Sequence, residues 1–170
     1  FSCVLSGIEQ AASEAGYNII VAQSNESYEQ EVKIVHSFLA ARVCGVIASL
    51  AKETSHYEHY QELLDNNIPI VFYDRICTGI KTERVVVDDY AGSFAAVEYM
   101  IQTGCKRICF YGSSPHLEIT KNRRNGYLDA MKKYHMPVDE GMMLLCDTRE
   151  QAIALTPDLL ESSNRPDGFF

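Results

Sequence analysis

The sequence lacks long apolar runs and clustered basic residues. No segment approaches the roughly 18 consecutive apolar residues that a transmembrane helix needs, and no basic stretch followed by an apolar one marks the start as a leader peptide. Lys and Arg number 15 against 23 Asp and Glu, for a net charge of -8. The one dense basic spot is Lys121, Arg123 and Arg124. We therefore expect no membrane partner and no nucleic-acid-binding surface in this part of the chain.

Motifs for catalysis and cofactor binding are also missing. There is no Gly-x-Gly-x-x-Gly fingerprint, no phosphate-binding Gly-Lys-Ser loop and no Gly-x-Ser-x-Gly nucleophile turn. Ser113 and His116 are too close in sequence to form a nucleophile and base pair. Cys105 and Cys109 lack a second pair at zinc-site spacing, and His56 and His59 fit exposed positions of a predicted helix. We expect no enzyme activity, no cofactor and no metal.

The six cysteines are scattered, which argues against a disulfide framework. Most of them have apolar neighbours, where a thiol behaves as a small hydrophobic group. A reducing compartment is the simpler interpretation, and we expect a cytoplasmic protein.

What the sequence does contain is a regular alternation of helix and strand patterns. The hydrophobic content of 46% is enough for one sizeable core or for two small lobes. Apolar residues at helical spacing predict helices over 2–15, from Ser27 onward, and over 55–66, 90–103, 122–134 and 150–162. Short apolar runs predict strands over 18–22, 43–50, 68–72, 84–87, 107–111, 142–146 and from 168. Apolar strands separated by helices indicate the α/β class, with parallel strands buried on both faces.

Several predicted strands end in polar residues. Asp74 and Arg75 follow the strand at 68–72, Asp88 follows the one at 84–87, and Gly112–Ser114 follow the one at 107–111. In open parallel sheets ligands bind beyond the carboxyl ends of the strands, where such side chains converge. Asp74 and Arg75 can instead pair with each other, and Asp88 or Asp89 can simply cap the next helix.

Six segments of the chain, in order, carry a resemblance to a known family: GIEQAASEAGYNIIVAQS (7–24), ARVCGVIAS (41–49), IPIVFYDR (68–75), VVVDDYAGSFAAVEYMIQTGCKRICFYGSS (85–114), Arg123 with Gly126-Tyr127 and Ala130-Met131, and RPDGFF (165–170). With these segments the sequence resembles the effector-binding domain of bacterial lac-repressor-type (LacI/GalR) transcription regulators. The resemblance implies a two-lobed periplasmic-binding-protein-like fold of type I, with residues 1–88 in the first lobe and 89–170 in the second. It also implies a small-molecule effector held between the lobes.

The same resemblance implies segments outside this chain. A first strand, a hinge helix and a DNA-reading helix-turn-helix are expected before Phe1, and further strands after Phe170. Operator DNA is therefore expected to bind only through a domain that this chain does not contain, and the cleft is expected to be incomplete.

Site residues follow from the resemblance by position. It implies effector contacts at Phe1, Asp74, Arg75 and Arg123, with Ser49 as a lining residue. An aromatic ring at Phe1 can stack on a sugar or a nucleobase, and an arginine can donate two hydrogen bonds in a fixed fork. Two departures from the family pattern leave questions open: Ile119 stands where many relatives have a small polar residue, and Arg124 beside Arg123 makes the register ambiguous.

Three functions compete at this point. The resemblance favours an allosteric sensor that acts as a homodimer, whose effector shifts the angle between the lobes and thereby the affinity for operator DNA. A periplasmic sugar-binding receptor of a transporter shares the fold, although the cysteine content argues against it. An enzyme on a doubly wound sheet lacks any recognisable catalytic group.

Overall fold

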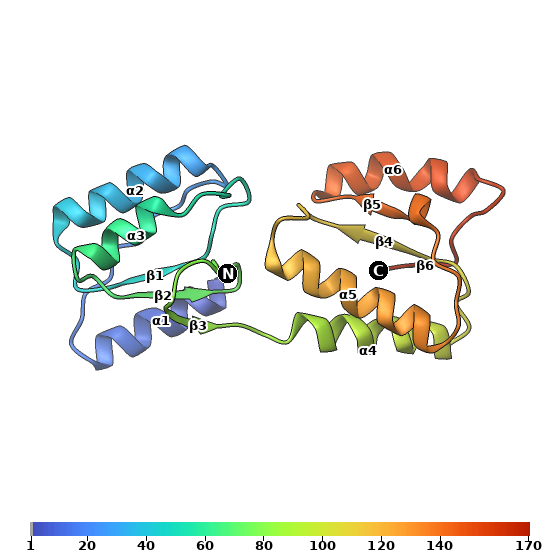
Figure 1. Ribbon diagram of the computed structural model, residues 1–170, viewed down its shortest axis with the longest axis horizontal. Helices are drawn as coiled ribbons and strands as arrows, with labels where there is room; N and C mark the ends of the chain where they lie inside the picture. The colour runs from blue at the N-terminus through green and yellow to red at the C-terminus, as the bar shows by residue number, and fades with distance from the viewer. Residues whose placement is uncertain (1) are drawn as a thin grey trace.

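The structure, a computed structural model that describes residues 2–170, has two lobes joined by one extended run of chain (Figure 1). The N-terminal lobe contains α1 (Ser2–Glu14), α2 (Tyr28–Ala41), β1 (Val46–Ala48), α3 (Glu58–Asp65), β2 (Ile70–Tyr73) and β3 (Glu83–Val85). The C-terminal lobe contains α4 (Asp89–Gln102), β4 (Ile108–Gly112), α5 (Glu118–Lys133), the 3-10 helix η1 (Glu140–Met142), β5 (Met143–Leu145), α6 (Arg149–Glu161) and β6 (Gly168–Phe169). Residues 86–88 connect β3 to α4 and are the link between the lobes.

Each lobe has its own three-stranded sheet, with strand orders β1-β2-β3 and β5-β4-β6. All the strand pairs are parallel. In the first sheet Phe72 of β2 lies between Ala48 of β1 and Arg84 of β3. The predicted α/β class and the parallel strands are confirmed, and the carboxyl ends of the strands in each sheet lie along one edge.

Three strand predictions need correction. Residues 18–22 are not a strand, and Ile20 and Val21 are more than half exposed. A strand needs a ladder partner, and within residues 2–170 no strand pairs with this run. β1 is confined to Val46–Ala48, shorter than the predicted 43–50. All of β3 is exposed, because this edge strand pairs only with β2 and the described helices do not cover it.

Most helix boundaries follow the predicted signals more closely, although α5 begins at Glu118 rather than near residue 122. Ser27 caps α2 by accepting a hydrogen bond from the backbone N–H of Gln30, and Asp88 caps α4 through Ala91. Gly16 ends α1 at φ 79°, and Gly104 follows α4 at φ 110°, conformations that residues with a side chain rarely adopt. α6 is continuous from Arg149 to Glu161, with Pro157 inside it.

Each lobe has its own hydrophobic core. The N-terminal core packs α2 and α3 against the first sheet around Val35, Leu63, Ile70 and Phe72. The C-terminal core packs α4 and α5 against β4, and its fully buried members are Val97, Ile108, Tyr127, Ala130 and Met131. In the part of the chain that the structure describes, no helix is long and apolar enough to cross a membrane.

Candidate functional site

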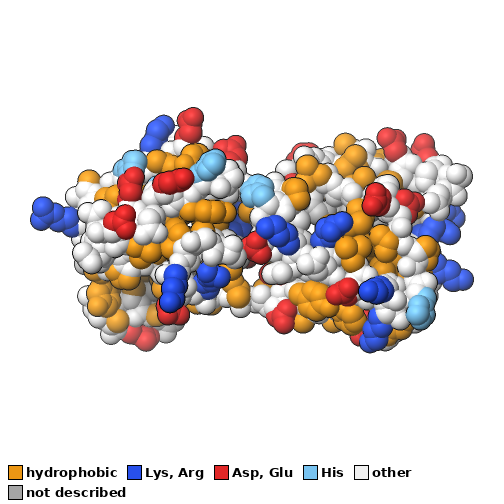
Figure 2. All heavy atoms as spheres, in the orientation of Figure 1, with side chains coloured by type: hydrophobic (Ala, Val, Ile, Leu, Met, Phe, Trp, Pro, Cys, Tyr) orange, Lys and Arg blue, Asp and Glu red, His pale blue; other side chains and the backbone are white. Residues whose placement is uncertain are grey.

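The carboxyl-terminal ends of the strands in one lobe face those in the other. Lys52, after β1, places its Nζ 2.8 Å from Oδ2 of Asp147, which follows β5. The Nε2 atom of His116, in the loop after β4, lies 2.9 Å from the backbone oxygen of Lys52. Figure 2 shows side chains of both charges and a histidine gathered where the two lobes meet. This junction is the candidate site.

Arg75 is fixed at this junction by Glu26. Its Nη1 and Nη2 atoms lie 2.6 and 2.8 Å from the two carboxylate oxygens of Glu26, a bidentate pair that spans 49 residues of sequence. This hydrogen bonding raises the pKa of Arg75 and lowers that of Glu26. The Arg75 side chain is mostly buried, at 13% exposure, so its guanidinium is held as a rigid group after the end of β2.

Asp74 is the weaker partner of Arg75. Its carboxylate lies 3.9 Å from Nε of Arg75, too long for a hydrogen bond. The residue adopts a left-handed backbone conformation with φ 57°, and its N–H donates to the oxygen of Val85. Asp74 and Arg75 therefore form a loose ion pair, as the alternative interpretation allowed, but Arg75 pairs more closely with Glu26, and the Asp74 side chain remains partly exposed.

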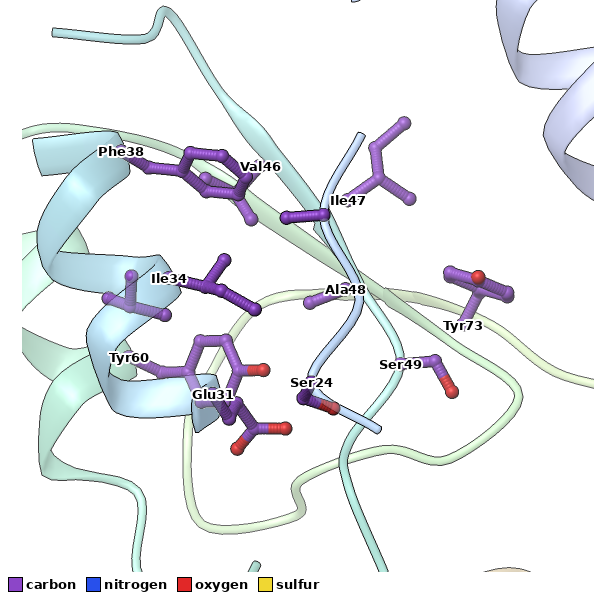
Figure 3. Close-up of a pocket in the computed structure, with 12 residues that line it drawn as sticks. Ser24, Glu31, Ile34, Phe38, Val46, Ile47, Ala48, Ser49, Tyr60 and Tyr73 are labelled. Carbon is purple, nitrogen blue, oxygen red and sulfur yellow. The ribbon is translucent and has the colours of Figure 1, made fainter. Parts of the chain in front are cut away.

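Ser49 lines a small cavity inside the N-terminal lobe. The cavity measures about 140 Å³ and is bounded by β1, α2 and the run before α2 that contains Ser24, together with Tyr60 of α3 and Tyr73 of β2 (Figure 3). The Oγ atom of Ser49 is buried and has no hydrogen-bond partner. Typical ligand pockets are about 300–1,000 Å³, so this cavity is too small to hold a sugar or nucleobase by itself. We read it as part of one half of the site.

A buried network around Glu31 supports the loop that carries Lys52. Glu31 is 4% exposed and accepts hydrogen bonds from the N–H of Ala51 at 2.6 Å and the hydroxyl of Thr54 at 2.7 Å. His59 contacts the same carboxylate at 3.0 Å. Burial alone raises the pKa of Glu31, but these hydrogen bonds outweigh it and hold the pKa below its usual value. The network ties α2 and α3 to the loop after β1.

The sequence-based view of His59 was wrong. His59 is only 3% exposed and is not a surface residue. Its Nε2 atom contacts the buried carboxylate of Glu31, on the side of α2 that faces α3. Glu62, three residues further along α3, pairs with His36. Across residues 2–170 no cluster of histidine, cysteine and acidic side chains has the arrangement that a metal ion requires.

Arg123 is engaged within its own lobe. Its Nε lies 2.8 Å from Oδ1 of Asp89 in the first turn of α4, and its backbone oxygen accepts a hydrogen bond from Ser93. Half of its side chain is exposed, at 53%. The pair places Arg123 beside the run that links the lobes. Phe1, the remaining candidate, lies outside the described residues.

The sequence analysis missed Glu26, Lys52, His116 and Asp147. Two of them had a usable signal: Lys52 and Asp147 come soon after predicted strands, at the same kind of position that drew attention to Asp74 and Arg75. Burial raises the pKa of Asp147, but the ammonium of Lys52 and the nearby Arg75 counter it and leave the pKa below its usual value. Glu26 carried no such signal, because its role depends on a contact distant in sequence.

A two-lobed arrangement of parallel sheets with a charged junction is the form of a periplasmic-binding-protein-like ligand-binding domain. Residues 1–168 match the family described as periplasmic binding proteins and the sugar binding domain of the LacI family, and the chain belongs to this family.

Among named relatives, the transcriptional regulator MalR of Streptococcus pneumoniae is 32% identical over 147 residues, which are 86% of this chain and 44% of MalR. The structure of the transcription regulator CcpA of Lactococcus lactis has a TM-score of 0.85 at 25% identity, over 95% of this chain and 59% of that one. The regulator Cra of Pseudomonas putida, solved with fructose 1-phosphate, has a TM-score of 0.84 at 22% identity, over 98% and 61% of the two chains, and shows likeness of fold alone. The chain spans about half the length of the curated relatives it matches.

Proposed function

We propose that this chain is the effector-sensing part of a LacI-type transcriptional regulator. A small molecule, a sugar or a nucleobase-like compound, binds between residues 1–88 and residues 89–170 and alters the affinity of the whole regulator for operator DNA. The observation that carries the proposal is the junction itself: charged side chains from strand ends of both lobes meet there at hydrogen-bonding distance. We assign no catalytic activity to the chain.

The side chains at the junction suit a ligand with many hydroxyl or ring-nitrogen groups. Arg75 offers fixed N–H donors, while the carboxylate of Asp74 and the unpaired hydroxyl of Ser49 offer acceptors. In the proposal Arg123 contributes from the second lobe and Phe1 stacks on the ligand. A rigid, pre-organised set of donors and acceptors reduces the entropy lost on binding.

The remaining parts of the proposal concern the whole protein. The curated relatives that the chain matches include transcriptional regulators and repressors, which favours a regulator over a transport receptor with the same fold. We propose that the complete protein is a cytoplasmic homodimer and that it reads operator DNA through a domain outside this chain. Effector and operator must then change each other's affinity by the same factor.

A ligand screen on the full-length protein tests the proposal. Neutral sugars, sugar phosphates and nucleobases are compared by thermal shift, and the affinity of the best ligand is measured by titration calorimetry. Arg123→Met is expected to weaken that ligand about tenfold or more, because it removes a charged donor worth about 1.4 kcal/mol. Its neighbour serves as the control: Arg124→Met is expected to change the affinity less than about twofold.

Circular dichroism establishes that both variants remain folded, since Arg123 also pairs with Asp89. Two results contradict the proposal. One is the absence of any stabilising ligand in all three classes together with operator binding that none of them alters. The other is an equal loss of affinity in the two arginine variants.

A further inference from the structure

The ion pair between Lys52 and Asp147 joins the two lobes directly. Its atoms are 2.8 Å apart, and the side chains are only 31% and 23% exposed. A charged pair that is partly shielded from water is stronger than one on an open surface, because the effective dielectric constant is lower. The pair is reinforced by the ring of His116, whose Nε2 lies 2.9 Å from the backbone oxygen of the same lysine.

On the N-terminal side, Lys52 is presented by a well-anchored loop. Its backbone N–H donates to Oε2 of Glu26 at 2.9 Å, and Glu26 is clamped by Arg75. The residues on either side of it are also fixed: the N–H of Ala51 donates to buried Glu31, and the N–H of Glu53 donates to the backbone oxygen of Glu26. The lysine therefore loses less freedom on pairing than a side chain on a mobile loop.

On the C-terminal side, Asp147 is equally constrained. The preceding residue, Cys146, donates its N–H to the oxygen of Gly112 and so continues the pairing of β5 with β4. The N–H of Asp147 donates to the side chain of Gln151 at 2.6 Å. Thr148 then begins α6 with a reciprocal capping box that uses the same glutamine. Lys52 and Asp147 are thus each carried by a backbone segment that hydrogen bonds hold in place.

We propose that Lys52 and Asp147 are positioning residues that hold the lobes at a closed spacing before any effector binds. The proposal goes beyond effector sensing, and it can be tested on the protein without a ligand. Its consequence is that the free protein already populates the closed arrangement. An effector then meets a partly assembled site and loses less affinity to the closing step than it would in an open protein.

The rival explanation is an incidental surface ion pair with no effect on the lobes. The chain offers a matched control for it, because Lys133 and Glu98 form a pair of nearly the same length, 2.6 Å, between α5 and α4. That pair has the same chemistry but lies within the C-terminal lobe. Its removal is expected to leave the spacing of the lobes unchanged.

Single-molecule energy transfer on the full-length protein measures the closed-to-open ratio without ligand. Dyes are coupled to unnatural amino acids at exposed positions 33 of α2 and 158 of α6, two helices that Figure 1 shows on the same side of their lobes. Lys52→Met and Asp147→Asn are each expected to lower the ratio about two- to fivefold, the range for ion pairs of this kind. Combining them is expected to cause little further change, since both remove one interaction.

Charge reversal distinguishes positioning from a general loss of structure. The double variant Lys52→Glu with Asp147→Lys is expected to recover most of the closed population, and about 1 M salt is expected to lower the ratio in the unmodified protein but not in Lys52→Met. The proposal is overturned if Lys52→Met leaves the ratio unchanged or if Lys133→Met lowers it equally. Neither of those results bears on whether an effector binds.

Discussion

The two lobes share a sheet-and-helix plan but hold their interiors together differently. The N-terminal lobe contains a buried charged network, in which Glu31, His59 and Thr54 are each less than 5% exposed. The core cluster of the C-terminal lobe is made of apolar and aromatic residues, and the hydroxyl of Tyr127 is satisfied by the backbone oxygen of Ile108. The N-terminal lobe thus adds a buried polar network to an apolar core, whereas the core cluster of the C-terminal lobe depends on close packing alone.

The difference matters because each lobe supports a different part of the junction. The Glu31 network fixes the loop of Lys52, which a purely apolar core could not orient by hydrogen bonds. In the C-terminal lobe, α5 approaches α4 closely at Gly126, and this contact aligns Arg123 with Asp89. We therefore expect lost hydrogen bonds to destabilise the N-terminal lobe most, and added side-chain volume to destabilise the C-terminal lobe most.

Removal of the buried carboxylate should have the largest effect. Glu31→Ala leaves the N–H of Ala51, the hydroxyl of Thr54 and the ring of His59 without their acceptor, at an expected cost of about 3–5 kcal/mol. Denaturant unfolding measures the loss, and hydrogen exchange should localise it to α2 and α3. Glu98→Ala is the matched control in the C-terminal lobe, because Glu98 also accepts from two side chains but on the surface. A similar loss in both variants would remove the contrast between the lobes.

The second-largest loss of stability is expected from added side-chain volume between α4 and α5. A Cβ atom at Gly126 would lie 2.5 Å from the backbone oxygen of Tyr90 and 2.8 Å from Cβ of Ser93, contacts that the helix backbones cannot relieve easily. Gly126→Ala is expected to destabilise the protein by about 1–3 kcal/mol, as overpacked sites do. Gly92→Ala, in α4, meets nothing within 4 Å and is expected to stabilise the helix by up to about 1 kcal/mol. Thermal unfolding of the two variants should therefore shift in opposite directions, and a loss in both would count against close packing as the cause.

Acidification should give the smallest and most specific difference. Because the folded pKa of Glu31 lies below its ordinary value, its contribution to stability is full above about pH 4.3 and is lost as the pH falls through the folded pKa. Glu31→Gln should flatten this acid dependence for peptides of the N-terminal lobe in hydrogen exchange. Peptides of β4 and α5 should keep the same profile in both proteins. An unchanged N-terminal profile in Glu31→Gln would show that other carboxylates govern the acid response.

Much of the fold was predictable because it depends on local patterns. Helical spacing and capping residues such as Ser27 and Asp88 located the helices, since these signals act within a few residues. The error at residues 18–22 has a different origin. That run has the composition of a strand, but a strand forms only where another strand supplies hydrogen bonds, and no local pattern reports this.

The candidate site was predictable only in part, for the same reason. The rule of polar residues at strand ends located Asp74 and Arg75, and applied more widely it also selects Lys52 and Asp147. It could not pair Arg75 with Glu26, or His59 with Glu31, because those contacts join residues 49 and 28 positions apart. The effector roles of Phe1, Ser49, Asp74, Arg75 and Arg123 stay predictions.

The run between β3 and α4 limits the kind of movement the molecule can make. Its residues Val86 and Val87 are exposed, at 53% and 72%, and β-branched residues favour an extended backbone. An extended run of this kind can rotate about its backbone bonds, but it cannot become much longer. In the described part of the chain this connection therefore allows the lobes to rotate against each other but limits how far they can separate, because an extended chain spans at most about 3.3–3.6 Å per residue.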